Sequence, residues 1–273
     1  MAAALLMMNM QGAVMAADKD QTIFRYSDKV PFALIINPNN HVTCREVWGT
    51  LWNKFRLTDI KEEIYSNSFI NYLKDALPKY QKLPSDFSNE TFFLVWYQKE
   101  HIFPEAKEYQ LTIDNAQINI SETDEASEIS TGHPYSVYRI GSFNHMNRLF
   151  DGDISDKEKV IQEKVSSFIE DFNPQNISPI NKLLVSIKLE DIKPQIQSLI
   201  QKYKQKRMEG IAKAICSSHI EDMIRMAENV IDAEGQQHKL QHPEETLEST
   251  KEIATLTLAE GFRWIKHSLY GAV

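Results

Sequence analysis

The stretch IFRYSDKVPFALIINPNNHVTCREVWGTLWNKF, residues 23–55, decides the fold expected for the first half of this chain. Between Ile23 and Ile36 the apolar residues fall at every second position, which is the period of a half-buried β-strand, and Asp28 marks a turn within it. Asn-Pro-Asn-Asn at 37–40 ends this extended segment. A helix is expected next, because the apolar residues change to helical spacing at Val47, Trp48, Leu51, Trp52 and Phe55.

The start of that helix carries a recognisable signal. Thr43-Cys44-Arg45-Glu46 has the form of a capping box, with Thr43 as the N-cap and Glu46 three residues later. Cys44 is then expected at the first helical position. Unpaired backbone N–H groups and the helix dipole at that position favour a thiolate, which is the nucleophilic form of cysteine.

Further elements are expected along the rest of the first half. Phe92 to Tyr97 is a continuous apolar run that indicates a buried strand. The other elements are a helix at 59–77 ended by Pro78, more strand at 109–120, an exposed acidic loop at 121–130, and a hairpin of 135–140 with 146–150.

The character of the sequence changes after Asp151-Gly-Asp153. Helices are expected from Ser155 to about 172, from 180 to 235 with a break at Pro194, and from 244 to 269. We therefore expect an α+β fold, in which a mixed α/β N-terminal half with a small antiparallel sheet packed on helices is followed by an all-helical bundle. The expected division is a flexible tail at 1–21, an α/β domain at 22–153 and a helical domain at 154–273.

Composition restricts the partners and the location. The 273 residues carry a net charge of −8, so the chain has no global footprint for nucleic acid. No run of eighteen apolar residues predicts a membrane span. Residues 1–21 have no Lys or Arg before Lys19, so no convincing signal peptide is expected. Two cysteines far apart indicate a reducing compartment, and hence a cytoplasmic location, which for a secreted effector would be the cytosol of a host cell.

Three residues of the first half form the constellation with the most chemical potential. Cys44 starts a helix, His133 follows Gly132 at the head of a predicted strand, and Asp151 ends the next one. A hairpin centred near Phe143 brings His133 close to Asp151. The carboxylate then holds the imidazole while the imidazole activates the thiol.

This order of residues resembles the papain-like thiol hydrolase and transferase superfamily. The resemblance implies an enzyme acting on a protein amide or isopeptide bond: a peptidase, a deubiquitinase-like hydrolase, a deamidase or a transglutaminase. It also implies Cys44 as nucleophile, His133 as base and then acid, and Asp151 as its orienting partner, without a metal or another cofactor. No Gln precedes Cys44 to stabilise the oxyanion, so Asn39 or Asn40 is the expected donor.

Other interpretations of these residues stay open. Cys44 shares the apolar face of its helix, so it is equally explained as a core-filling thiol. Asp153 competes with Asp151 for the orienting role, and His41 and His145 compete with His133. In the second half, the pairs Cys216/His219 and His238/His242 superficially suit zinc, but a core cysteine and surface histidines explain them better.

A second function class is a non-catalytic interaction module. It would be a secreted effector or adaptor that binds a protein partner through its helical half. The acidic run Glu244-Glu245 with Glu248 resembles the Glu-rich C-terminal signals of some bacterial type IV effectors, although the first turn of a helix also prefers acidic residues. The surroundings of the Cys44 sulfur discriminate the two classes, because a nucleophile must reach both an imidazole and a substrate.

Overall fold

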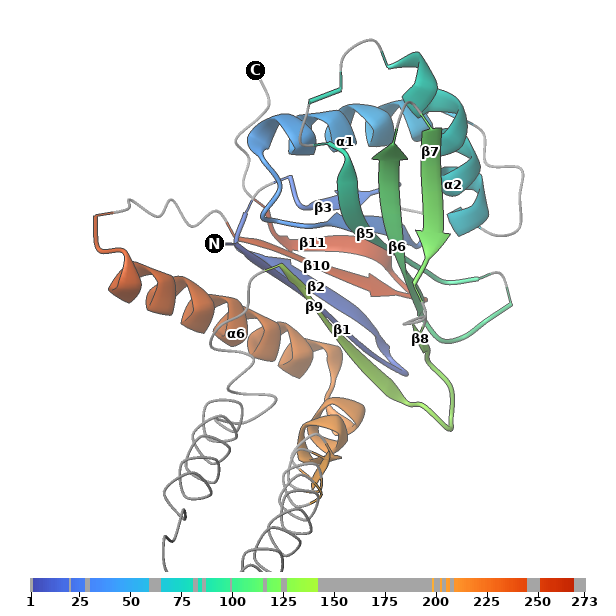
Figure 1. The fold of residues 1–273 in the computed structure, drawn as a ribbon. Coiled ribbons are helices and arrows are strands. Elements are labelled where there is room, and N and C mark those ends of the chain that lie inside the picture. Colours follow the sequence, from blue (N-terminus) through green and yellow to red (C-terminus); the bar gives the residue numbers. More distant parts are fainter. Residues whose placement is uncertain are drawn as a thin grey trace, which may run out of the picture. The chain divides into compact units, whose positions relative to one another are not determined.

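A computed structural model describes residues 2–141 with short gaps, residues 209–244 and residues 251–267, together with a few single residues between 198 and 206. The chain divides into two compact units, residues 1–143 with 214–273, and residues 144–213. The first unit contains two antiparallel sheets and the helices that cover them (Figure 1).

The first sheet is built from both ends of the described chain. Its five strands lie in the order β11-β10-β2-β1-β9, and each neighbouring pair is antiparallel. The strands are β1 (Ala3–Asn9), β2 (Gly12–Ala17), β9 (Tyr135–Gly141), β10 (Glu252–Thr257) and β11 (Gly261–Lys266).

The second sheet contains the strands predicted at 23–36, 92–97 and 109–120, together with β8, which lies in the predicted loop at 121–130. Its main order is β3-β4-β5-β6-β7, and the short β8 pairs with the start of β6. The strands are β3 (Ile23–Arg25), β4 (Phe32–Ile36), β5 (Asn89–Trp96), β6 (Glu105–Asp114), β7 (Gln117–Glu122) and β8 (Ser127–Glu128).

Helices cover the outer face of each sheet. The helices α1 (Val42–Phe55) and α2 (Tyr65–Ala76), with the short η1 (Leu77–Lys79), pack on the second sheet. The long helix α6 (Ile220–Gln241) contacts β1, β2 and β10 of the first sheet. The order of layers is therefore helix, sheet, sheet, helix (Figure 1). Within the described residues, no helix combines the length and apolar character needed to cross a bilayer.

Alternation along β4 and β5 divides the apolar side chains between two cores. Ala33 and Ile35 of β4 face the core between the sheets, whereas Phe32, Leu34 and Ile36 face the core beneath α1 and α2. β5 divides its residues in the same way, because successive side chains of a strand point to opposite faces. Both faces of β4 and of most of β5 are thus buried, which explains the continuous apolar run that predicted β5.

The predicted flexible tail at 1–21 requires correction. Residues 3–17 form β1 and β2, and every position of both strands is buried. One face of β1 packs into the core between the sheets through Ala4, Leu6 and Met8. An apolar run with no charged residue is typical of a strand buried on both faces, and that is what these residues form.

The predicted all-helical second half is also wrong. Residues expected in a helix at 244–269 form β10 and β11, which pair antiparallel across the turn at 258–260. Gly261 follows the turn with φ 68°, a conformation that glycine adopts without strain. The spacing of Ile253, Leu256 and Phe262 matched a helix by coincidence, because a tight turn separates two strand segments.

The predicted N-cap of α1, Thr43, is wrong by two residues. The helix begins at Val42, and His41 is its N-cap without a side-chain hydrogen bond to the first turn. Cys44 is therefore the third helical residue. The apolar stripe is as predicted, since Val47, Trp48, Leu51, Trp52 and Phe55 are all buried.

Candidate functional site

Cys44 lies inside the core between α1 and the second sheet. Its side chain is 1% exposed and belongs to the same apolar cluster as Val47 and Trp48. It forms no disulfide. A substrate carbonyl has no access to a sulfur in this position, so the placement fits the interpretation of Cys44 as a core thiol.

His133 lies in a different part of the unit. It is exposed in the turn before β9, where its backbone N–H donates to the Ser130 carbonyl oxygen at 3.1 Å. The structure therefore places His133 on a surface turn and Cys44 in the helix-covered core. Asp151 lies outside the described residues, so its pairing with His133 remains a prediction.

The two expected oxyanion donors have partners within the fold. Asn39 Oδ1 accepts a hydrogen bond from the Ala2 N–H at 2.7 Å. The Asn40 amide donates to Glu90, whose carboxylate also accepts from Trp48 Nε1–H at 3.1 Å. These contacts join the loop after β4 to the start of β1 and to β5, so Asn39 and Asn40 have a structural role.

The histidine and cysteine pairs of the second half lie at opposite ends of α6. His219 is the N-cap of α6, and His238 and His242 lie at its C-terminal end with ring centroids 4.8 Å apart. At 1.5 Å per residue, His219 and His238 are about 28 Å apart along the helix axis, too far to share one metal ion. Within the part of the chain that is described, no group of three or more His, Cys, Asp or Glu is arranged to hold a metal.

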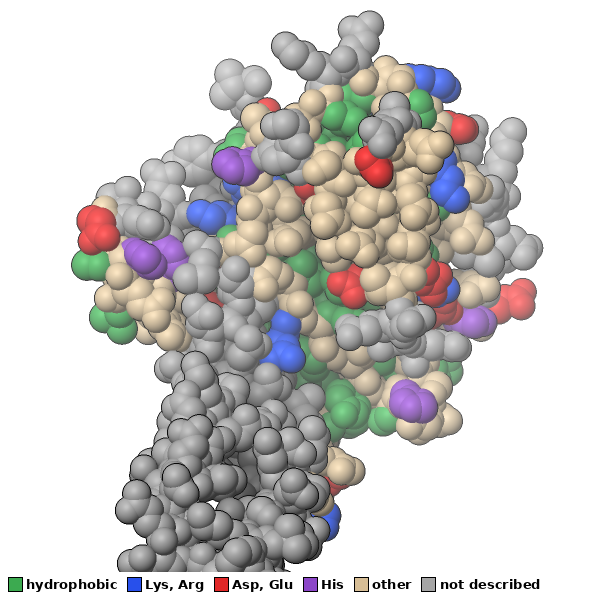
Figure 2. Space-filling model, viewed as in Figure 1, with side chains coloured by type: hydrophobic (Ala, Val, Ile, Leu, Met, Phe, Trp, Pro, Cys, Tyr) green, Lys and Arg blue, Asp and Glu red, His purple; other side chains and the backbone are tan. Residues whose placement is uncertain are grey.

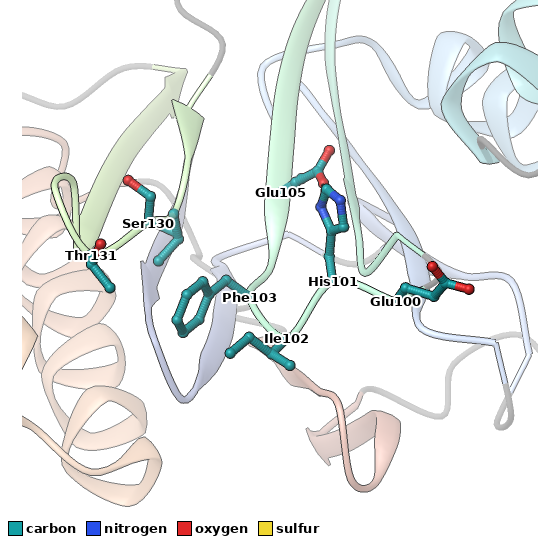
Figure 3. A pocket seen from close by; sticks show the side chains of 8 residues that line it. Glu100, His101, Ile102, Phe103, Glu105, Ser130 and Thr131 are labelled. Carbon is teal, nitrogen blue, oxygen red and sulfur yellow. The ribbon is translucent and has the colours of Figure 1, made fainter.

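A pocket that the sequence did not predict opens at one end of the two sheets (Figure 3). Its volume is 330 Å³, at the lower end of the range for small-molecule and side-chain pockets. Two segments form it, the loop between β5 and β6 and the residues after β8. The lining residues are Glu100, His101, Ile102, Phe103, Glu105, Ile129, Ser130 and Thr131.

The pocket combines an apolar floor with carboxylates. Ile129 is buried and Phe103 packs against the core between the sheets, so both are held by that core. Ile102 is 62% exposed. Glu105 is 13% exposed, and its Oε1 lies 2.8 Å from His101 Nδ1.

The loop that carries these residues holds an unusual backbone conformation. Glu100 has φ 74°, in the left-handed region that only a few per cent of non-glycine residues occupy. The His101 N–H donates to the Gln98 carbonyl at 2.9 Å and closes the turn. Such conformations persist only where the surroundings hold them, so the loop is a defined structure.

Other turns gather at the same end of the sheets. Leu256 and Thr257 lie against Gly12, where an added Cβ would be 2.8 Å from the Leu256 carbonyl oxygen. The turns at 10–11 and 258–260 are therefore neighbours, and β9 begins nearby with Tyr135 paired to Asn9. We call residues 10–11, 98, 100–104, 129–134 and 258–260 the pocket end. Figure 2 shows hydrophobic, acidic and histidine side chains together on the lower right of the visible face.

Large apolar side chains are exposed on the turns of the pocket end. They are Met10, Ile102 and Leu258. The Tyr97 phenol is buried at the end of β5, and this burial raises its pKa to about 12, with the nearby Leu258 backbone opposing the shift. The signal in the sequence was Ile102-Phe103, two large apolar residues in a short polar loop between strands.

The opposite end of the sheets holds two carboxylates, Asp18, which is half-buried, and Glu252, which is fully buried. Burial raises the pKa of Asp18, although its Oδ1 accepts the Ala3 N–H at 2.9 Å. Glu252 is 0% exposed and accepts hydrogen bonds from the backbone N–H groups of Gln21, Thr22 and Ile23, each at 3.1 Å. Both carboxylates satisfy backbone donors and therefore hold the ends of strands together.

Comparisons with known proteins add no family to this description. No family model matches the chain, and no curated protein is significantly similar to it.

Proposed function

We propose that this protein is a non-catalytic binding module and that the pocket end is the surface on which it binds a protein partner. The observation that carries the proposal is the position of Ile102, which is 62% exposed at the rim of a 330 Å³ pocket. Exposed apolar residues that gather beside a concave site, as Met10, Ile102 and Leu258 do at the pocket end, are typical of a contact surface.

The neighbouring turns extend this surface. Met10 and Leu258 are about half exposed on turns of the pocket end. Burying a large aliphatic side chain completely stabilises a complex by about 1.5–3 kcal/mol, so the exposed part of Ile102 alone supplies about 1–2 kcal/mol. Together these residues supply the apolar centre that a small interface requires.

The burial of Cys44 favours this class of function over a thiol enzyme. Cys44, which the sequence suggested as a nucleophile, is 1% exposed within an apolar cluster. A binding module needs no reactive group, and the pocket end offers shape, apolar area and charge for recognition.

Panning a random peptide library displayed on phage against the immobilised full-length protein tests the proposal. We expect enriched peptides whose binding is lost in Ile102→Ser, because this exchange removes the apolar contact at the rim without changing the charge. Val42→Ser is the matched control, since Val42 is 57% exposed on α1, away from the pocket. Enriched peptides that bind Ile102→Ser and the wild type equally, or no enrichment at all, would overturn the proposal.

A further inference from the structure

We infer that the pocket receives the side chain of an arginine or lysine from the partner. This inference rests on the proposed function, since it names the chemistry of the group that the pocket end binds. It follows from the charges on the pocket wall, the apolar floor and the net charge of the chain.

The carboxylates supply the first part of the argument. Glu100 and Glu105 both line the pocket; the Glu105 carboxylate lies beside the His101 ring, whereas that of Glu100 is directed away from Phe103 (Figure 3). Glu105 is 13% exposed, so it is partly withdrawn from water, and its Oε1 lies 2.8 Å from His101 Nδ1. Because a carboxylate has two acceptor oxygens, it can accept a charge-assisted hydrogen bond from a guanidinium or ammonium group as well as one from an imidazole.

The floor of the pocket supplies the second part. Arginine and lysine bury their methylene stems along apolar surface and keep the charged head at a polar rim. Phe103 and Ile129 are anchored in the core and provide such a surface, and Ile102 adds to it at the rim. The ring of Phe103 also offers a face on which a cation is attracted.

The hydroxyl groups and the overall charge agree with a cationic ligand. Ser130 and Thr131 line the wall opposite the carboxylates and are hydrogen-bond acceptors as well as donors (Figure 3). The chain carries a net charge of −8, which attracts a basic partner at long range.

A pair of small probes isolates the charge. Nα-acetyl-arginine methylamide is compared with its citrulline counterpart, which has the same shape and no charge, by titration into the full-length protein followed by amide NMR. We expect the arginine probe to shift the amide signals of residues 101–103, 105 and 129–131 at millimolar concentration. An ion pair of about 1 kcal/mol makes the citrulline probe about fivefold weaker.

Variants test the residues named. Glu105→Gln removes one charge at nearly constant shape and should reduce the difference in affinity between the two probes. Glu46→Gln is the control, because Glu46 is exposed on α1 and should leave the preference intact. Thr131→Lys, at an exposed turn position, should repel the arginine probe, whereas Thr131→Gln should not, and this pair remains informative should Glu105→Gln fail to fold.

Each outcome decides the inference separately from the proposed function. Equal shifts with both probes, or shifts outside the pocket residues, overturn the inference. In that case the proposed function still stands if neutral peptides bind at the pocket end. No shift with either probe also overturns the inference. If panning yields no peptide that depends on Ile102, the proposed function fails, whichever probe binds.

Discussion

Replacing Glu252 by glutamine should destabilise the protein more than any other single exchange of a carboxylate for an amide described above. Glu252 is 0% exposed and lies in β10, yet it accepts hydrogen bonds from three consecutive backbone N–H groups of residues 21–23. His267 Nδ1 lies 3.3 Å from the same carboxylate. The side chain therefore joins strands that are about 230 residues apart along the chain.

The magnitude follows from the bonds that glutamine can keep. Its one carbonyl oxygen still accepts from Thr22 and Ile23, but as a neutral acceptor, which loses about 1 kcal/mol per bond relative to a charged one. Its NH₂ group faces the Gln21 N–H, so that charge-assisted bond, worth about 1.5–3 kcal/mol, is lost, although water reaches the exposed Gln21. Relief from burying a charge offsets part of this loss, and the net cost is about 2–4 kcal/mol.

Urea denaturation followed by fluorescence measures the free energy of unfolding of wild type and variant. Glu260→Gln is the control, because Glu260 is 59% exposed and pairs only with Arg263 nearby at 3.4 Å, so we expect a change within about 0.5 kcal/mol. The slope of the transition should be equal in all three proteins. A Glu252→Gln variant within about 0.5 kcal/mol of wild type would refute the reasoning.

Three further predictions test other parts of the structure. Burial raises the pKa of Asp18, so the folded state holds this proton more tightly than the unfolded chain, and stability falls as pH rises from the unfolded value of 3.8 through the folded one. Asp18→Asn should therefore be more stable than wild type at pH 7 in thermal melts, with a difference that disappears toward pH 4; a constant difference would contradict this. Cys44 should resist iodoacetamide in the native protein and react once it is unfolded, as read by peptide mass spectrometry, and rapid native alkylation would show that the core around it opens. Gly141→Ala should lower the free energy of unfolding by about 2 kcal/mol or more, because φ is 96° and a Cβ would be 2.5 Å from the Ala2 carbonyl oxygen. Gly132→Ala is the control: its Cβ would be 3.9 Å from the nearest atom, Ser130 Oγ, so the change should be within about 0.5 kcal/mol. Equal denaturation midpoints for the two variants would refute the difference.

Strands with a regular pattern were predictable from local sequence. The alternation at 23–36 became β3 and β4, and the apolar run at 92–97 became most of β5. The apolar stripe of α1 was also predictable, because burial of a helix requires apolar residues every three or four positions. Only the first turn was misplaced, since a capping pattern names a favourable start and tertiary contacts select the register.

The sites depended on contacts that local sequence does not contain. Cys44 has a sequence context that suits a nucleophile, but its burial under α1 is decided by the sheet against which the helix packs. The pocket requires the loop before Glu105 to meet residues 129–131 across β8, and nothing in either segment names the other. Its one local signal is the exposed Ile102 beside Phe103.

By itself, the sequence determined the period of each strand and helix that is buried on one face, because such an element must alternate apolar and polar residues at its own repeat. It also determined the acidic charge, which is a property of composition. Only the tertiary structure decided that residues 3–17 and 252–266 belong to one sheet and that the Glu252 carboxylate binds the backbone N–H of Thr22. It also decided that Cys44 is buried whereas Ile102 is exposed. The physical reason is that a strand buried on both faces loses its alternation, and pairing between distant segments is settled by the core and the backbone hydrogen bonds that they share.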